Sequence, residues 1–522
     1  MPNQKLTLDN FQVGMVDEQQ LSKMTYPDGA AISAVNVYYT PRGALTKRNG
    51  IGAIHTTSPC SAAFTKLHLW TDSQRYPHTL AFSVSASTAS ASIYDVDTSL
   101  TPPAFSAVHV TAGAWKPSQL DAITVDNYAG SAVFSYTGSN FSPVAYNGTN
   151  CVTLTAAPSG ARALCSYYNY LVVGNFTLTG TRYASRVQWN SAGDTNSWPA
   201  INWLDLDPDD GDEITALASF NEVIIAWKHN KMFVLYYIGG MAVFQPLRLS
   251  TYIGCVGPNA WYDDKDNIYF MSDKGAYAWT GQGLPAYISE PLLHTFESFN
   301  WPISIQFEVQ GFWELDHIMF SVASHGSSTR DTMAVYDTLT KSWSMFTMNV
   351  SCMSYGVWQG VTTYASATLS WTSYPQSYDE LVDIGTEVML MGNYQGFIGS
   401  YGNTTEDFGN AVNGYWVSRW LDMGNADLTK RIMRITVMVD RGGSYNLGVQ
   451  VYKDWNTTVL ANYSVPLSNP IYTTGMIEKR VDFTLQGRAF RVQVGTSDPG
   501  TPFTVHKLIV EWVQKGKTLV NA

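Results

Sequence analysis

The chain has 522 residues, of which 45% are hydrophobic, 13% are aromatic and only 14% are charged, and its net charge is −11. This length exceeds what one ordinary hydrophobic core supports, so we expect two or three domains. The excess of acidic residues repels phosphate and argues against sequence-independent binding of DNA. The low charged fraction is typical of β-rich proteins in large assemblies or outside cells, and it argues against a helical cytosolic enzyme.

Residues 1–55 do not share the pattern of the rest of the chain. The segment AISAVNVYY, at residues 31–39, predicts a short strand, although a helix over residues 28–35 is an alternative. A turn at Pro41–Gly43, a further strand and a second turn at Asn49–Gly50 follow. We interpret this region as an extended segment that carries a docking strand.

Residues 56–401 contain short strands that recur regularly, most clearly between Asp205 and Gly283. Two similar units follow each other there, and in each of them three apolar runs rich in Val, Ile, Tyr, Phe and Trp are separated by polar turns. A small antiparallel sheet repeated about every 40 residues is the signature of a β-propeller blade. The pattern predicts a propeller of six to eight blades, and a β-sandwich with short loops is the alternative.

Beyond residue 401 the pattern changes. Residues 402–414 are polar and rich in Gly and Asn, which is typical of a linker. Residues 415–522 contain longer and more widely spaced alternating strands, which predict a separate antiparallel β-sandwich. The expected fold class is therefore all-β, with an extended N-terminal segment, a propeller and a C-terminal sandwich.

The densest cluster of charge lies in one acidic run of the propeller region. Its members are Asp205, Asp207, Asp209, Asp210, Asp212 and Glu213. An EF-hand loop would need Gly at its sixth position and Glu at its twelfth, but counting from Asp205 these are Asp210 and Ala216. We therefore predict no EF-hand and no metal ligands here, and a looser cation site is the alternative. A solvated loop between blades and a loop that faces a channel remain as interpretations.

Motifs of catalysis are missing from the sequence. It contains no HExxH pair, no G-x-S-x-G elbow and no P-loop. We therefore expect no enzyme, no catalytic residue and no cofactor. A propeller hydrolase stays as a third hypothesis, because the two carboxylates of a glycosidase have no fixed spacing in sequence.

The five cysteines stand singly, at positions 60, 151, 165, 255 and 352. An odd number of thiols without CxxC spacing fits folding in a reducing cytoplasm. The first residues lack the pattern of a signal peptide, and no run of about 18 apolar residues predicts a transmembrane helix. We expect a protein made in a cytoplasm and without a membrane anchor.

Four stretches, taken in their order along the chain, carry a family resemblance. They are Asn36-Val-Tyr-Tyr with Arg42–Gly50, Arg186–Trp189 with Gly193-Asp194 and Trp198, Asp210–Leu217, and Ile253–Cys255 with Tyr269–Gly275. Together they resemble the nozzle, or tail-tube, proteins of short-tailed bacteriophages, a family that includes tail tubular protein B and packaged-DNA stabilisation protein. The resemblance covers most of residues 30–281 and, more loosely, the C-terminal sandwich.

The resemblance implies a structural virion protein of the phage tail, made in the host bacterial cytoplasm. It implies a homohexameric ring below the portal and the adaptor protein, near tail fibres or spikes. This ring would retain and then release packaged double-stranded DNA without sequence-specific binding. Because an acidic wall repels DNA and keeps it centred, we predict that the run from Asp205 to Glu213 faces the channel or its rim.

The alternative function is a carbohydrate-binding or receptor-binding propeller module of a tail fibre or a cell surface. The chain has 17 Trp and 31 Tyr residues, and aromatic rings stack on sugars. The same rings could instead fill the cores between blades. A sixfold ring in the electron microscope favours the nozzle, whereas binding to a glycan array favours this alternative.

Overall fold

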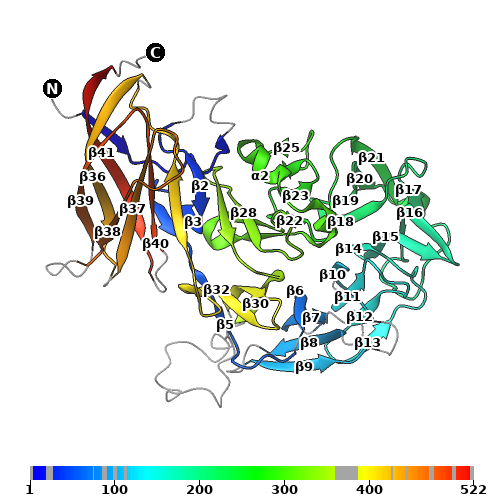
Figure 1. Ribbon diagram of the computed structural model, residues 1–522. Helices are drawn as coiled ribbons and strands as arrows, with labels where there is room; N and C mark the ends of the chain where they lie inside the picture. The colour runs from blue at the N-terminus through cyan, green and yellow to red at the C-terminus, as the bar shows by residue number, and fades with distance from the viewer. Residues whose placement is uncertain are drawn as a thin grey trace, which may run out of the picture.

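The computed structural model shows a ring of small sheets beside a β-sandwich (Figure 1). It describes residues 4–18, 27–60, 62–73, 76–84, 91–97, 103–110, 115–118, 120–358, 386–424, 427–442, 445–468, 475–496 and 501–517. The expected all-β fold class, with a propeller and a sandwich, is confirmed.

Five blades are four-stranded antiparallel sheets made from consecutive strands. The first is β6 (Ala63–Thr71), β7 (Pro77–Val84), β8 (Ala91–Asp97) and β9 (Ala104–Val108). The second is β10 (Ile123–Tyr128), β11 (Ser131–Tyr136), β12 (Val144–Tyr146) and β13 (Cys151–Thr153). The third is β14 (Ala163–Tyr167), β15 (Tyr170–Leu178), β16 (Thr181–Trp189) and β17 (Trp203–Asp205). The fourth is β18 (Ile214–Phe220), β19 (Val223–Lys228), β20 (Met232–Tyr237) and β21 (Phe244–Ser250), and the fifth is β22 (Trp261–Asp263), β23 (Ile268–Ser272), β24 (Gly275–Trp279) and β25 (Ala286–Tyr287).

Two further blades complete a ring of seven, which lies within the predicted range of six to eight. The sixth is β26 (Glu308–Phe312), β27 (His317–Val322), β28 (Thr332–Asp337) and β29 (Trp343–Thr347). The seventh is β30 (Cys352–Trp358), β31 (Thr386–Gly392), β32 (Ile398–Thr404) and, from the N-terminal segment, β5 (Gly50–Ala53). The ring closes where the inner strand β30 packs against β6. Residues 366–371, whose sequence also has a strand pattern, lie outside the described residues.

Apolar strands fill the space between blades. Trp227 of β19 is fully buried and stacks against Trp261 of the next blade, with ring centroids 6.1 Å apart. Phe233 of β20 is also buried. Because both faces of a blade are covered, such strands are nearly continuous apolar runs instead of alternating ones. Both side chains therefore lie in the core of the propeller.

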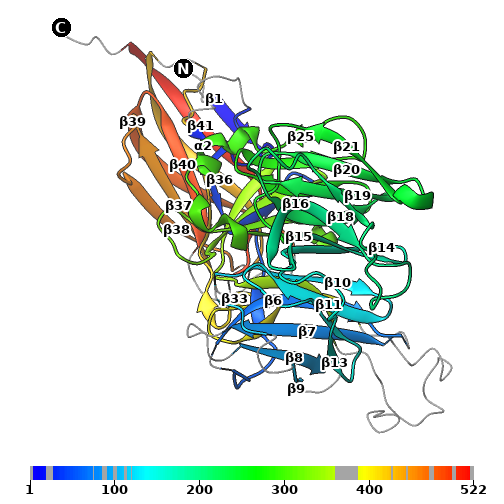
Figure 2. The ribbon, with the colours of Figure 1, turned by 90° about the vertical axis from the view of Figure 1, so that its right-hand side faces the viewer.

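The sandwich contains strands from both ends of the chain. One sheet has the order β3 (Val37–Tyr39), β4 (Leu45–Lys47), β41 (Thr504–Lys517), β36 (Leu428–Asp440) and β39 (Met476–Gly487), with β1 (Gln4–Leu8) also paired to β41. The other has the order β2 (Ala31–Val35), β35 (Gly414–Ser418), β40 (Phe490–Thr496), β37 (Asn446–Lys453) and β38 (Ala461–Pro466). Because β2 also pairs with β29, the second sheet continues into the sixth blade. Figure 2 shows β1 and β41 together at the end of the sandwich.

Two sequence-based expectations differ from the structure. Residues 31–35 form a strand and not the alternative helix. The stretch 402–414, expected as a linker, continues β32 to Thr404 and then carries β33 (Glu406–Asp407) and β34 (Asn410–Ala411). Its polar, Gly-rich composition suits a linker, but here it allows β33 to lie close beside β5.

Helices are few and short. Within the part of the chain that the structure describes they are η1 (Gly240–Ala242), η2 (Glu290–Leu292), α2 (Leu293–Glu297), η3 (Trp301–Gln306) and η4 (Trp313–Leu315). Among the residues with described positions, none of them has the length and hydropathy needed to span a bilayer.

Candidate binding sites along the propeller axis

The acidic run from Asp205 to Glu213 connects the outer strand of the third blade, β17, to the inner strand of the fourth, β18. Basic side chains from several strands neutralise it. The ion pairs are Asp205 with Arg186, Asp207 with Lys231 and Arg248, Asp210 with Lys228 and Lys231, and Glu213 with Arg162 and Arg182. Asp212 accepts hydrogen bonds from the backbone N–H groups of His229 and Asn230, and Asp209 is exposed.

Lys228 is the buried centre of this network. Its Nζ donates to both carboxylate oxygens of Asp210 at 2.7 and 2.8 Å, to the Asp207 carbonyl at 2.9 Å and to Ser185 Oγ at 3.0 Å. Burial alone would raise the pKa of Asp210, but hydrogen bonds from Lys228 and Lys231 lower it to about 2. The run is therefore an ion-paired connection between two blades.

None of the six acidic residues lines the cavities along the propeller axis. Whether the run faces a channel through an oligomer stays a prediction. The described residues contain no group of three or more His, Cys, Asp and Glu side chains placed to hold a metal ion.

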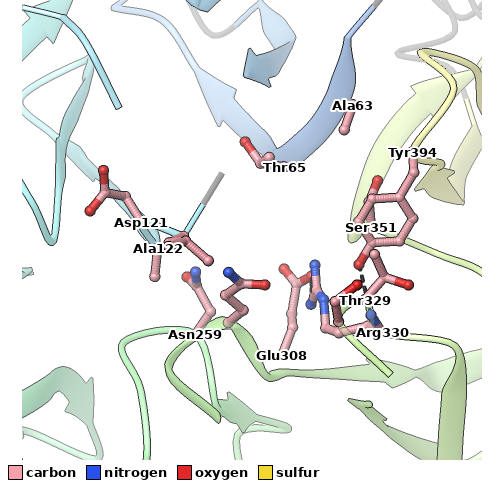
Figure 3. A pocket seen from close by; sticks show the side chains of 13 residues that line it. Ala63, Thr65, Asp121, Ala122, Asn259, Glu308, Thr329, Arg330, Ser351 and Tyr394 are labelled. Atoms are coloured by element: carbon pink, nitrogen blue, oxygen red, sulfur yellow. Dashed lines mark hydrogen bonds and ion pairs between the residues drawn. The ribbon is translucent and has the colours of Figure 1, made fainter. Parts of the chain in front are cut away.

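One cavity, which we call the upper cavity, lies where the inner strands begin, and its volume is about 220 Å³. Its lining includes Asp121, Asn259, Glu308, Arg330 and Ser351 (Figure 3). Because inner strands of different blades converge on the axis, residues far apart in sequence meet here.

Glu308 is held by two cations at the base of the upper cavity. Its Oε1 accepts from Lys66 Nζ at 2.8 Å, and its Oε2 accepts from Arg330 NH1 at 3.0 Å and from the Met353 N–H at 3.2 Å. Burial opposes ionisation, but the charges of Lys66 and Arg330 prevail and lower the pKa of Glu308. The carboxylate is therefore ionised and fully hydrogen-bonded.

A second cavity of about 570 Å³, the axial channel, lies further along the same inner strands. Its lining includes Lys66, His68, Asp126, Asn259 and Tyr168, so the Lys66–Glu308 ion pair joins it to the upper cavity. Burial lowers the pKa of His68 to about 4, and burial raises the pKa of Asp126 above its ordinary value despite hydrogen bonds from Ser166. The space along the axis is thus lined by both polar and apolar side chains.

A third hollow, which we call the tyrosine groove, lies between the third and fourth blades and has a volume of about 770 Å³. Its aromatic lining includes Tyr168, Tyr236 and Tyr237, whose exposed fractions are 71%, 42% and 49%. Tyr168 also lines the axial channel, so the two hollows meet at this ring.

Two tight turns form the floor of the tyrosine groove. The turn between β14 and β15 places Tyr168 at φ 47°, and the turn between β18 and β19 places Asn221 and Glu222 at φ 44° and 64°. A bulky residue rarely adopts the left-handed region, and such strain is concentrated at functional sites. Tyr167 ties the two turns together, because its hydroxyl donates to the Glu222 carbonyl at 2.6 Å.

The groove can hold a ligand that offers flat apolar faces and many hydroxyl groups. Exposed phenol rings provide the stacking surfaces, and Asn169, Asn221 and Glu222 line the groove with amide and carboxylate groups. A few placed polar groups among aromatic side chains are typical of small-molecule sites.

Sequence reasoning missed both the Glu308 ion cluster and the tyrosine groove. Lys66 comes from the first blade, whereas Glu308 and Arg330 come from the sixth, and the three have no common spacing. The groove had a local signal in Tyr167-Tyr168-Asn169-Tyr170. A tyrosine occupies a hairpin turn position there that usually takes Asn or Gly.

Comparisons with known proteins give only structural likenesses, because no family model and no curated protein matches the chain. PorZ, a bacterial surface component of the type-IX secretion system of Porphyromonas gingivalis, is 11% identical with a TM-score of 0.35, and the match covers 73% of this chain and 44% of PorZ. An α-L-arabinanase of Penicillium chrysogenum is 13% identical with a TM-score of 0.35, covering 56% and 98% of the two chains. An exo-β-1,3-galactanase of Phanerochaete chrysosporium is 10% identical with a TM-score of 0.26, covering 87% and 99%.

Two of these structures are glycoside hydrolases, which contradicts the expectation that the chain is not an enzyme. That expectation rested on missing sequence motifs. Residues on separate blades can meet at a propeller axis without any such motif, as Lys66 and Glu308 do here. Identities of 10 to 13% limit the likeness to the fold.

Proposed function

We propose that the chain is a carbohydrate-binding propeller module and that the tyrosine groove is its binding site. The observation that carries this proposal is the set of three solvent-exposed tyrosine rings, Tyr168, Tyr236 and Tyr237, around one hollow. Exposed rings grouped in a hollow cost solvation energy unless a ligand covers them, and sugar rings present the apolar C–H faces that stack on them.

The support of the rings makes the groove a rigid site. Tyr237 lies 6.2 Å from both Tyr167 and Tyr170, and Phe244 packs edge-on against the latter two rings at 5.5 and 5.7 Å. Because these rings are already packed, little side-chain entropy is lost when a ligand binds. The axial channel beside Tyr168 gives room for a second sugar of a longer glycan.

A glycan array probed with the purified chain tests this proposal. We expect a restricted set of glycans to bind and Tyr168→Ala to weaken binding about tenfold, the effect of roughly 1.4 kcal/mol of lost stacking. Tyr76→Ala is the matched control, because Tyr76 is 62% exposed on the first blade and does not line the groove. A blank array, or equal losses in both variants, would refute the proposal.

A second candidate function is that of a subunit of a phage tail nozzle. Asn36 and Arg48 belong to the stretches that carry the family resemblance. They favour this candidate because their hydrogen bonds join the domains. Asn36 donates to Thr347 Oγ1 and to the Asn413 carbonyl, both at 2.7 Å. The buried Arg48 donates to Asn36 Oδ1 at 2.8 Å and to Asp407 at 2.9 Å. Residues that carry the resemblance thus hold the domains together, as expected of a structural subunit.

In this second candidate the chain would form a homohexamer that binds the adaptor protein and surrounds passing DNA. Single-particle electron microscopy of the purified protein should then show sixfold rings with a central opening. A protein that stays monomeric at high concentration and in the presence of the adaptor would contradict this candidate. The two functions are compatible, because a tail subunit can also contact glycans of the cell surface.

A further inference from the structure

We propose that the upper cavity is a second ligand site, specific for a small molecule that carries one carboxylate and several hydroxyls, the chemistry of a uronic acid. The upper cavity lies at the start of the inner strands, whereas the tyrosine groove lies at the turns that follow their ends. This inference therefore goes beyond the proposed groove and does not rest on it.

At the base of the cavity two cations share one carboxylate. Lys66 and Arg330 both pair with the single carboxylate of Glu308, at 2.8 and 3.0 Å. The side chains of Glu308 and Arg330 are only 3% and 6% exposed. This cluster of three side chains therefore carries one net positive charge, and a buried charge without a full counterion is unfavourable.

Arg330 has donors to spare for that anion. Within the described part of the chain its guanidinium makes one hydrogen bond, from NH1 to Glu308. Figure 3 shows the guanidinium at the cavity beside Glu308. The planar group of an arginine matches a carboxylate with two parallel N–H···O bonds, which a lysine cannot reproduce.

The other carboxylate of the lining, Asp121, does not compete for Arg330. Its Oδ2 accepts from the backbone N–H and the hydroxyl of Ser118 at 2.7 and 2.9 Å. In Figure 3 the carboxylate of Asp121 points away from Glu308 and Arg330. The guanidinium of Arg330 is thus not paired with Asp121, which lies on another part of the lining.

Polar groups around the base of the upper cavity can form hydrogen bonds with the hydroxyl groups of a ligand. Ser351 lines the cavity, and its buried Oγ makes no hydrogen bond to another described residue. Tyr394 accepts from the Arg330 N–H at 2.9 Å, which leaves its own proton to donate. Asn259 uses its Nδ2 on the Ile123 carbonyl at 2.9 Å, which leaves its side-chain oxygen as an acceptor. A volume of about 220 Å³ is below the roughly 300–1,000 Å³ of sites for drug-sized ligands, so the cavity suits a single sugar ring.

Isothermal titration of the full chain with sodium D-glucuronate tests this site, with D-glucose and sodium acetate as comparison ligands. We expect saturable binding of glucuronate at one site, at least tenfold tighter than binding of glucose or acetate. Ser351→Ala should weaken glucuronate binding about fivefold to tenfold, as expected for one lost hydrogen bond. Arg330→Lys should abolish the preference for glucuronate over glucose, and its thermal melting shows whether the variant is folded.

Tyr168→Ala is the control that separates the two sites, because it alters the groove and should leave glucuronate binding unchanged. Loss of array binding in Tyr168→Ala with intact glucuronate binding supports two independent sites. The proposal is overturned if glucuronate does not bind saturably, if glucose binds equally well, or if Ser351→Ala has no effect in a folded protein.

Discussion

Lys228 shows at the scale of single residues why the acidic run is a connector. Its side chain is fully buried, and every bond it makes is to the segment that links the third and fourth blades or to β16. A buried ammonium without a counterion is strongly unfavourable. The carboxylate of Asp210 is therefore needed for the stability of this part of the fold.

We predict that Asp210→Asn lowers the free energy of unfolding by about 3–5 kcal/mol, the cost of breaking a buried ion pair. Asp209→Asn is the matched control, because its side chain is exposed in the same segment, and it should change stability by less than about 0.5 kcal/mol. Chemical denaturation of both variants measures the difference. Similar values for the two would show that Lys228 is solvated in solution.

The same ion pair predicts how the effect depends on pH. The pKa of Asp210 falls from an ordinary value of 3.8 to about 2 in the folded protein. A carboxylate whose pKa is lower in the folded chain than in the unfolded chain stabilises the fold fully at pH values above its unfolded pKa. This stabilisation is lost as the pH falls through the folded pKa. The difference in melting temperature between wild type and Asp210→Asn should therefore be constant above about pH 5 and should shrink toward pH 2.

Sequence reasoning located the acidic run but not its role. The run was visible as a local cluster, whereas its partners are distant in sequence: Arg162 precedes β14, and Arg186 and Arg248 lie on β16 and β21. Only the arrangement of blades brings them together. For the same reason the Glu308 cluster could not be predicted, because Lys66 on β6 meets Glu308 and Arg330 of the sixth blade only in the ring.

At the scale of elements, inner and middle strands were predictable and outer strands were not. The runs that the sequence analysis recognised between Asp205 and Gly283 correspond to β18–β20 and β22–β24. The fourth strands β21 and β25 were missed. β21 is mostly exposed and β25 has only two residues, and half-solvated edge strands lack a continuous apolar run.

The closure of the ring by β5 was also beyond sequence reasoning, because β5 is far from β32 in the chain. The structure explains why Gly50 begins this strand. A Cβ atom at Gly50 would lie 2.2 Å from the carbonyl oxygen of Glu406 and 2.5 Å from its carbonyl carbon. The backbone of β33 therefore approaches β5 too closely for any side chain.

We predict that Gly50→Ala opens the seventh blade and increases hydrogen exchange in β5 and β32. The loss in free energy of unfolding should exceed the roughly 1 kcal/mol expected for Gly409→Ala. Gly409 has a φ of 82° and open space around it, so this control variant measures the effect of backbone strain alone. If the two variants exchange equally, the contact between β5 and β33 is looser in solution than in the structure.

At the scale of the whole molecule, the propeller and the sandwich act as one unit, because a nine-stranded sheet runs from β26 to β38 through β2. The space along the propeller axis is lined by side chains and crossed by the Lys66–Glu308 ion pair. Any passage for DNA would therefore have to lie between subunits.

This argument gives a prediction for the second candidate function. If the chain forms a ring, the central opening should be bounded by several copies and not by one propeller. A map of the oligomer at side-chain resolution would check this, and it would show whether the run from Asp205 to Glu213 faces the opening. A ring whose opening coincides with a single propeller axis would contradict the prediction.

A crystal structure of the chain with a glycan selected on the array tests the central claim most directly. The account predicts sugar rings stacked on Tyr168 and Tyr237, with hydroxyls bound by Asn169, Asn221 or Glu222 in the tyrosine groove. A glycan bound on another surface, with these tyrosines still exposed to solvent, would contradict it.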